Sequence, residues 1–163
     1  MNILNKFWEW YNRRYLVALS VTTFLFLLQL FHLYWLFTDV ILLKLAHRSY
    51  FAFPPIWGAV STVLDYTEIP ALISTSLVYI NQMRLTGHRK NLWYLLALNI
   101  QWLHLFWITD QVVIEHLGQH SFFHWANLVA WVAILIDYAE LPVMYDTAKK
   151  TVFEFSAFFR KDN

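Results

Sequence analysis

One motif occurs twice in this chain and constrains its fold more than any other feature. The first copy reads Asp-Tyr-Thr-Glu-Ile-Pro over residues 65–70, and the second reads Asp-Tyr-Ala-Glu-Leu-Pro over residues 137–142. Each copy lies in a long apolar segment, where an ionised side chain costs at least about 2.5 kcal/mol on membrane-insertion scales. Acids three residues apart share one face of a helix. We therefore expect this face to contact something other than lipid.

The repeat extends well beyond the acidic motif. Residues 29–70 align with residues 101–142 without a gap, at an offset of 72 positions, and share about 13 identities in 42 positions. Gln29 matches Gln101, and His32 matches His104. Because a repeat determines architecture, we expect two units, about residues 15–81 and about residues 87–153. Together they would form a single transmembrane domain over residues 1–163.

The composition indicates an integral membrane protein surrounded by the lipid bilayer. The chain is 59% hydrophobic and only 14% charged, which is too apolar for an ordinary soluble domain. Its apolar segments are long enough to cross about 30 Å of hydrocarbon, and they cover residues 15–37, 56–80, 92–114 and 125–145. The absence of cysteine excludes disulfides and thiolate metal sites. A net charge of +1 gives no indication of a nucleic-acid partner.

The distribution of positive charge predicts the orientation in the membrane. One side carries Lys6, Arg13, Arg14, Arg84, Arg89, Lys90, Lys149, Lys150, Arg160 and Lys161. The other side carries only Lys44 and Arg48, so both termini are predicted to be cytoplasmic. Each unit has two spans, and both units therefore enter the membrane in the same direction. The expected fold is an all-α four-helix bundle of two parallel two-helix repeats, with a pseudo-two-fold axis along the membrane normal.

The repeated polar residues predict a metal site in the bundle core. Six side chains are the candidate ligands: His32, Asp65, Glu68, His104, Asp137 and Glu140. Two imidazoles and four carboxylates match the donor count of a dinuclear site in a ferritin-like bundle, and two divalent cations would neutralise the four negative charges. Gln29 and Gln101 are predicted to orient the histidines. The site requires the first helix to continue to about Ala46, which would bring His32 level with Glu68.

Iron, manganese and zinc all accept this donor set, and the chemistry depends on which metal binds. With iron, open coordination positions in an apolar bundle would suit oxygen activation beside a lipid-soluble substrate, giving a membrane oxidoreductase. One alternative is a relay or transporter that passes protons or cations between the acids and histidines. Another is a haem held by His32 and His104, which four nearby acids disfavour. A third is an accessory subunit of a larger membrane complex, pinned by polar bonds of about 1 kcal/mol each.

A second group of histidines lies outside the repeat pattern. His116, His120 and His124 are spaced four apart and resemble part of a histidine box of membrane hydroxylases. Gly118 interrupts a helix at this point, and the aligned residues of the first unit are not histidines. We expect a solvated or partner-facing loop on the outer side of the membrane.

Overall fold

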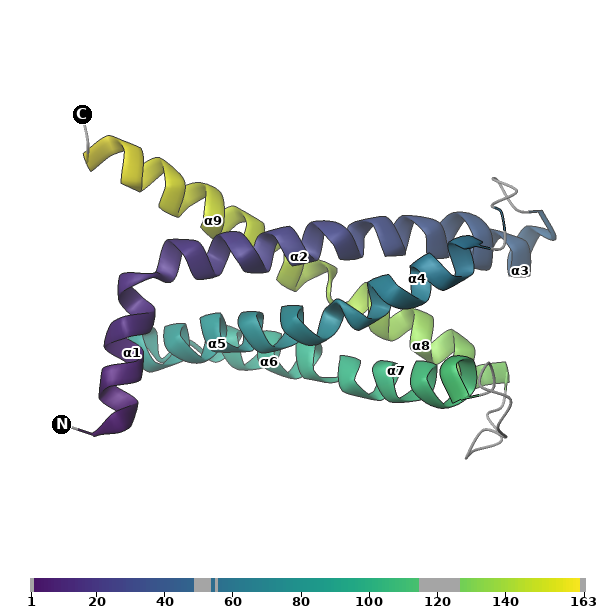
Figure 1. Cartoon of the computed structure of the whole chain (residues 1–163), viewed down its shortest axis with the longest axis horizontal. Helices are drawn as coiled ribbons and strands as arrows, with labels where there is room; N and C mark the ends of the chain where they lie inside the picture. Colours follow the sequence, from purple (N-terminus) through teal and green to yellow (C-terminus); the bar gives the residue numbers. More distant parts are fainter. Residues whose placement is uncertain (1, 49–53, 55, 115–126, 162–163) are drawn as a thin grey trace.

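The computed structural model describes residues 2–48, 54, 56–114 and 127–161, and every secondary-structure element in that part is helical (Figure 1). One continuous helix runs from α2 (Tyr15–Trp35) through the π-helix η1 (Leu36–Ile41) into α3 (Leu42–Ala46). It ends at His47, whose φ of 52° is left-handed. The predicted continuation of the first helix to Ala46 is therefore confirmed.

The next helical segment is broken beside the first acidic motif. It consists of α4 (Ile56–Tyr66) and α5 (Glu68–Thr86), with Thr67 between them. Pro70 has no N–H, so the carbonyl of Tyr66 loses its helical donor and the helix is interrupted. The bend occurs where the sequence predicts it, but it places Asp65 in α4 and Glu68 in α5. The two acids thus belong to two helices, and not to one face of a single helix as expected.

The second half of the chain follows a similar order of elements, with the two helices α6 (Arg89–Asn99) and α7 (Gln101–Ile108) in place of the unbroken α2. It also contains the π-helix η2 (Thr109–Ile114), α8 (Asn127–Ala139) and α9 (Leu141–Lys161). Each π-helix follows a segment with a histidine and a tryptophan, and α8 ends just before Glu140 and Pro142, as α4 ends before Pro70. Gly87 joins the halves with a φ of 67° and caps α5 through its N–H to Met83. Local structure therefore repeats together with the sequence.

The long helices pack lengthwise around one apolar core. Helix α2 packs against α5 and α9, α5 against α6, and α4 against α7. Both chain ends lie at the same end of the molecule as the α5–α6 connection, where α1 (Ile3–Arg13) runs across the other helices (Figure 1). The buried core includes Phe26, Leu33, Leu72, Tyr79, Leu98, Leu105, Ile134 and Val143.

The outer surface is unusually apolar for a protein in water. Two helices in the described part, Tyr15–Ala46 and Leu128–Arg160, are long and apolar enough to cross a membrane. Only 33% of the most apolar stretch of each is buried, whereas the core helix of a soluble protein is mostly buried. Along α2 the exposed positions include Val17, Val21, Phe24 and Phe31, which form one continuous apolar face. Such a face favours contact with lipid.

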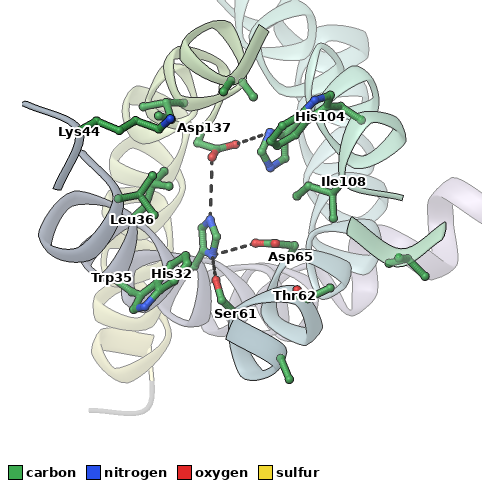
Figure 2. Close-up of a pocket in the computed structure, with 17 residues that line it drawn as sticks. His32, Trp35, Leu36, Lys44, Ser61, Thr62, Asp65, His104, Ile108 and Asp137 are labelled. Atoms are coloured by element: carbon green, nitrogen blue, oxygen red, sulfur yellow. Dashed lines mark hydrogen bonds and ion pairs between the residues drawn. The ribbon is translucent and has the colours of Figure 1, made fainter. Parts of the chain in front are cut away.

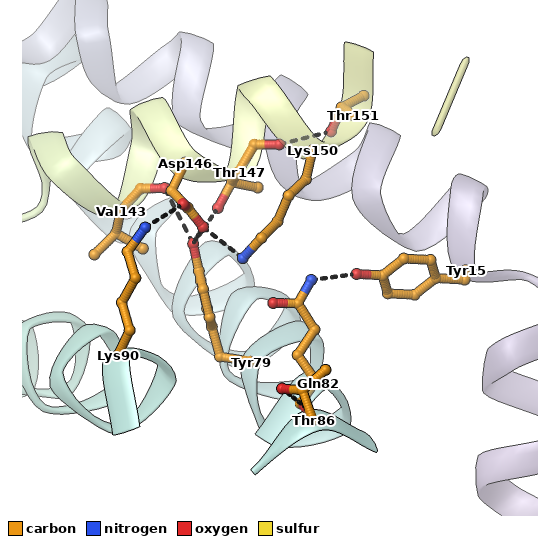
Figure 3. A network of polar contacts seen from close by, with 10 residues as sticks. All are labelled: Tyr15, Tyr79, Gln82, Thr86, Lys90, Val143, Asp146, Thr147, Lys150 and Thr151. Atoms are coloured by element: carbon orange, nitrogen blue, oxygen red, sulfur yellow. Dashed lines mark hydrogen bonds and ion pairs between the residues drawn. The ribbon is translucent and has the colours of Figure 1, made fainter. Parts of the chain in front are cut away.

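Asp146 joins three helices at the end of the molecule where the termini lie (Figure 3). Its carboxylate accepts a hydrogen bond from the Tyr79 hydroxyl of α5 at 2.9 Å and one from Lys90 of α6 at 3.0 Å. It also pairs with Lys150, one turn along α9, at 2.5 Å. The aligned residue of the first half is Ser74. This ionic contact therefore exists in only one half of the repeat.

Candidate functional site

His32 occupies the centre of a group of buried polar side chains in the middle of the molecule (Figure 2). Its Nδ1 lies 2.9 Å from the Ser61 hydroxyl and 2.8 Å from Oδ1 of Asp65, both on α4. Its Nε2 faces the other half of the chain, 3.9 Å from Oδ2 of Asp137 on α8. The imidazole therefore lies between a carboxylate of each repeat.

His104 makes the equivalent contact within the second half. Its Nδ1 lies 3.2 Å from Oδ1 of Asp137, as Nδ1 of His32 lies close to Asp65. Each histidine also has the same relation to the tryptophan one turn later. The two ring centroids are 6.0 Å apart in both halves, with interplanar angles of 43° for Trp35 and 44° for Trp107. Asp137 contacts both imidazoles, which produces a connected series Asp65, His32, Asp137, His104 (Figure 2).

The two glutamates lie near this series and are deeply buried. Glu68 and Glu140 each expose only 1% of their surface. Glu68 interacts electrostatically with Glu140, Asp137 and Asp65, and Glu140 interacts with Asp137 and His32. The structure therefore brings all six predicted ligands into one cluster. The carboxylate in contact with His32 is Asp65, whereas the sequence predicted Glu68 at the level of His32.

Gln29 and Gln101 bind the main chain in the structure. The Gln29 amide donates to the Leu64 carbonyl at 2.9 Å and to the Thr67 hydroxyl at 2.9 Å. The Gln101 amide donates to the Ile136 carbonyl at 2.9 Å. Ile136 aligns with Leu64 in the repeat. We predicted that these amides orient the histidines. Instead, each fixes the backbone just before an acidic motif, because its side chain reaches the neighbouring helix one turn away from the imidazole.

Many nitrogen and oxygen atoms of the cluster make no hydrogen bond. Of the described side-chain atoms that are buried without a hydrogen-bond partner, most belong to the repeated polar residues. They are Gln29 Oε1, His32 Nε2, Asp65 Oδ1, Glu68 Oε2, Gln101 Oε1, both ring nitrogens of His104 and both carboxylate oxygens of Asp137. A buried polar atom without a partner costs about 1 to 3 kcal/mol. Ion contacts connect several of these groups, but much of the hydrogen-bonding capacity at the centre of the cluster is not used.

A cavity of about 710 Å³ opens on the cluster. Its polar lining consists of His32, Lys44, Ser61, Thr62, Asp65, His104 and Asp137 (Figure 2). The remaining walls are mainly apolar: Trp35, Leu36, Val40, Ala59, Trp107, Ile108, Val113, Ala130, Ala133 and Ile134. The volume is that of a pocket for one small molecule. A molecule in this cavity would meet an apolar wall and an acid–imidazole floor.

Sequence reasoning missed Ser61, which contacts His32 through its hydroxyl. The aligned residue in the second half is Ala133, which also lines the cavity but has no hydroxyl. The two histidines therefore have different surroundings despite the repeat. A comparison of the two aligned segments could have revealed this difference, since a lone serine opposite an alanine in an apolar helix is a visible departure from symmetry.

The described residues contain no group of three or more His, Asp or Glu side chains already arranged to hold a metal ion. Four of the six predicted ligands are connected through contacts between histidine and aspartate, and the two glutamates interact with this series electrostatically. His116, His120 and His124 lie outside the described residues. The comparison with known proteins adds no relative, because no protein-family model, curated protein or solved structure matches the chain.

Proposed function

We propose that the chain is a polytopic membrane protein, a four-helix bundle of two parallel repeats with both termini in the cytoplasm. The continuous apolar face of α2 supports burial in lipid. The matching contacts of Gln29 with Leu64 and of Gln101 with Ile136 support a repeat that extends to tertiary structure. Both termini lie at one end of the molecule (Figure 1), as an even number of spans requires.

We further propose that the central cluster binds one or two divalent metal ions. The proposed ligands are His32, Asp65, Glu68, His104, Asp137 and Glu140. One observation carries this proposal, which is the set of buried nitrogen and oxygen atoms without hydrogen bonds at the centre of an apolar molecule. Two of them, Glu68 Oε2 and His104 Nε2, take no part in the ion contacts between the histidines and aspartates either. Buried charges in proteins are paired with other charges or coordinate metals. When all four carboxyl groups are ionised, the two histidines carry too little positive charge to balance them, and a divalent metal would supply the difference.

Metal binding requires these ligands to turn toward a common centre. In the structure Asp137 lies between His32 and His104, so its carboxylate would have to release at least one imidazole to become a ligand beside it. Rotations about the Asp and His side-chain bonds would suffice, since the cavity leaves room on one side of the cluster. The proposed site therefore differs from the present arrangement in side-chain torsions and keeps the same helices.

The cavity beside the proposed metal site indicates which class of reaction the protein would catalyse. A redox-active metal at the floor, for which iron is our first candidate before manganese and zinc, would lie next to a mostly apolar space of about 710 Å³. This setting fits a membrane oxidoreductase that acts on a lipid-soluble substrate. The chain residues would hold the metal, exclude water and shape the substrate space.

Elemental analysis of the protein, purified in mild detergent without chelators, tests the metal proposal. We expect a stoichiometric divalent metal in the natural protein and loss of metal in Glu68→Gln and Glu140→Gln, which keep side-chain shape but remove charge. Glu9→Gln, at an exposed position of α1, is the matched control and should retain the metal. Absence of stoichiometric metal from the natural protein would refute the proposal.

A relay is the second candidate, and the connected series of contacts favours it. Asp65, His32, Asp137 and His104 alternate acid and imidazole at separations of 2.8, 3.9 and 3.2 Å. Such groups can exchange protons when His32 and Asp137 close the 3.9 Å gap to hydrogen-bond distance. In liposomes, a relay would give proton or cation flux that Asp137→Asn abolishes, with no metal present. If neither metal nor flux is found, the chain is best explained as an accessory subunit of a larger membrane complex.

A further inference from the structure

Lys44 is a cationic residue that lines the otherwise mainly apolar part of the cavity. It belongs to α3, at the opposite end of the molecule from the termini. Its side chain points toward the interior of the ring of helices (Figure 2). Lys44 has no ion pair or hydrogen bond with any residue that the structure describes. A positive charge is thus available near the mouth of an apolar cavity.

The π-helix η1 explains why Lys44 faces the cavity. Successive α-helical residues rotate by about 100°, so a residue twelve positions after His32 would point about 120° away from it in a regular α-helix. A π-helical turn bonds residue i to i+5 and accommodates one additional residue. Apart from Trp35, the cavity-lining residues of this helix accordingly recur every fourth position, as His32, Leu36, Val40 and Lys44. The π-helix thereby aligns the ammonium with the imidazole on one face.

The separation of His32 and Lys44 along the helix axis suits an elongated ligand. Twelve residues correspond to about 18 Å of helix rise. Leu36 and Val40 fill that interval on this helix, while Ile108 and Val113 line the cavity from the other half. A ligand in the cavity would therefore encounter a cation at one end, apolar walls along its length and the acid–imidazole cluster at the other end.

We propose that the cavity binds a single-chain anionic amphiphile, with its carboxylate or phosphate head at Lys44 and its alkyl chain directed toward the cluster. The amphiphile would be the substrate class of the proposed oxidoreductase. Only the role of the cluster as the reactive end rests on that proposed function. Charge complementarity at Lys44 selects the head, since an exposed ammonium that lines the cavity can form a charge-assisted hydrogen bond with an anionic group. A cavity of about 710 Å³ selects one chain over a two-chain phospholipid.

Binding of radiolabelled palmitate, hexadecyl phosphate and hexadecanol tests the proposal in a neutral detergent. We expect saturable binding of both anions to the natural protein and much weaker binding of the alcohol. Lys44→Met should weaken anion binding about tenfold or more, as expected for loss of a charge-assisted contact, and Lys44→Arg should largely retain it. Lys149→Met is the control, because Lys149 is exposed at the other end of the molecule.

A second variant tests the cavity independently of charge. Ala59 lines the cavity from α4 and is exposed, so Ala59→Phe should fill the space without disturbing the core, and should reduce binding of both anions. The relative affinities of palmitate and hexadecyl phosphate would identify the head group. Equal binding of hexadecanol, or anion binding that is unchanged in Lys44→Met or in Ala59→Phe, would overturn the proposal.

The same samples separate this inference from the metal proposal. Metal content is measured in each variant, and binding is repeated after treatment with a chelator. Lys44-dependent binding that survives the chelator would support an amphiphile site that does not need the metal. Lys44-dependent binding to protein that contains no metal when purified without chelators would support the amphiphile site and refute the metal site. Stoichiometric metal together with anion binding that ignores Lys44 would overturn the amphiphile site alone.

Discussion

His32 and Asp137 come from different halves of the chain, and the Nε2 of the histidine lies 3.9 Å from Oδ2 of the aspartate. This contact joins two copies of the same motif at the centre of the molecule. Asp137 also contacts His104 within its own half, at 3.2 Å. The aspartate therefore holds a shared position that its aligned partner Asp65 does not have. Because of this asymmetry, we expect mutations at aligned positions of the two repeats to change stability by different amounts.

We predict that Asp137→Asn destabilises the protein more than Asp65→Asn. Loss of the Asp137 charge removes the acidic partner of two buried imidazoles, and breaking a buried pair costs about 3 to 5 kcal/mol. In Asp65→Asn, His32 keeps the Ser61 hydroxyl at 2.9 Å and the Asp137 carboxylate. Thermal unfolding in detergent measures the difference. Equal shifts in the two variants would contradict the asymmetric site.

The stability effects of replacing Gln29 and Gln101, which are aligned in the repeat, can be compared in the same way. Gln101→Leu and Gln29→Leu each remove a hydrogen bond to a carbonyl, with an expected cost of about 1 to 3 kcal/mol if that carbonyl stays unsatisfied. After Gln29→Leu, the Leu64 carbonyl still accepts from the N–H and hydroxyl of Thr67, at 2.9 and 2.7 Å. The aligned residue Ala139 has no hydroxyl to offer. We therefore expect Gln101→Leu to lower the unfolding temperature more than Gln29→Leu, and the reverse order would refute this explanation.

Asp146→Asn should reduce stability without affecting metal binding. The change weakens the contacts with Tyr79, Lys90 and Lys150, and we expect a loss of about 1 to 3 kcal/mol. Tyr94 and Asp146 both raise the pKa of Lys90, so this lysine keeps its positive charge throughout the neutral range and loses it only as the pH rises through the raised value.

Unfolding curves and metal content, measured on one preparation of Asp146→Asn, test the predicted loss of stability and the predicted retention of metal. Metal loss in this variant would show that stability, and not the central ligands, controls occupancy.

Topology can be tested with single cysteines, because the natural chain contains none. His88→Cys and Arg48→Cys place thiols at exposed positions at opposite ends of the molecule. We expect an impermeant thiol reagent to label Arg48→Cys in intact cells, and His88→Cys only after the membrane is opened. The natural protein serves as the unlabelled control. Labelling of both variants from the same side would overturn the four-span arrangement.

Several features follow from the sequence by itself, because they depend on local chemistry. The apolar segments and the absence of early breaks predict the long helices, including the continuation to Ala46. Pro70 and Pro142 predict the interruptions beside the acids, since proline cannot donate the required hydrogen bond. The identities at an offset of 72 select Gln29, His32, Asp65 and Glu68 with their counterparts as one group. The structure places these buried polar residues together.

Only the tertiary structure decides which members of that group touch. The sequence cannot show that Asp137, and not Asp65, lies between both histidines, because this contact depends on how α2, α7 and α8 rotate and cross. It also cannot show that η1 adds a residue to its turn and aligns Lys44 with His32 along one cavity wall. A helix break or a π-turn changes the direction of every side chain beyond it. Repeated residues therefore determine which groups are available, and helix packing determines the contacts they make.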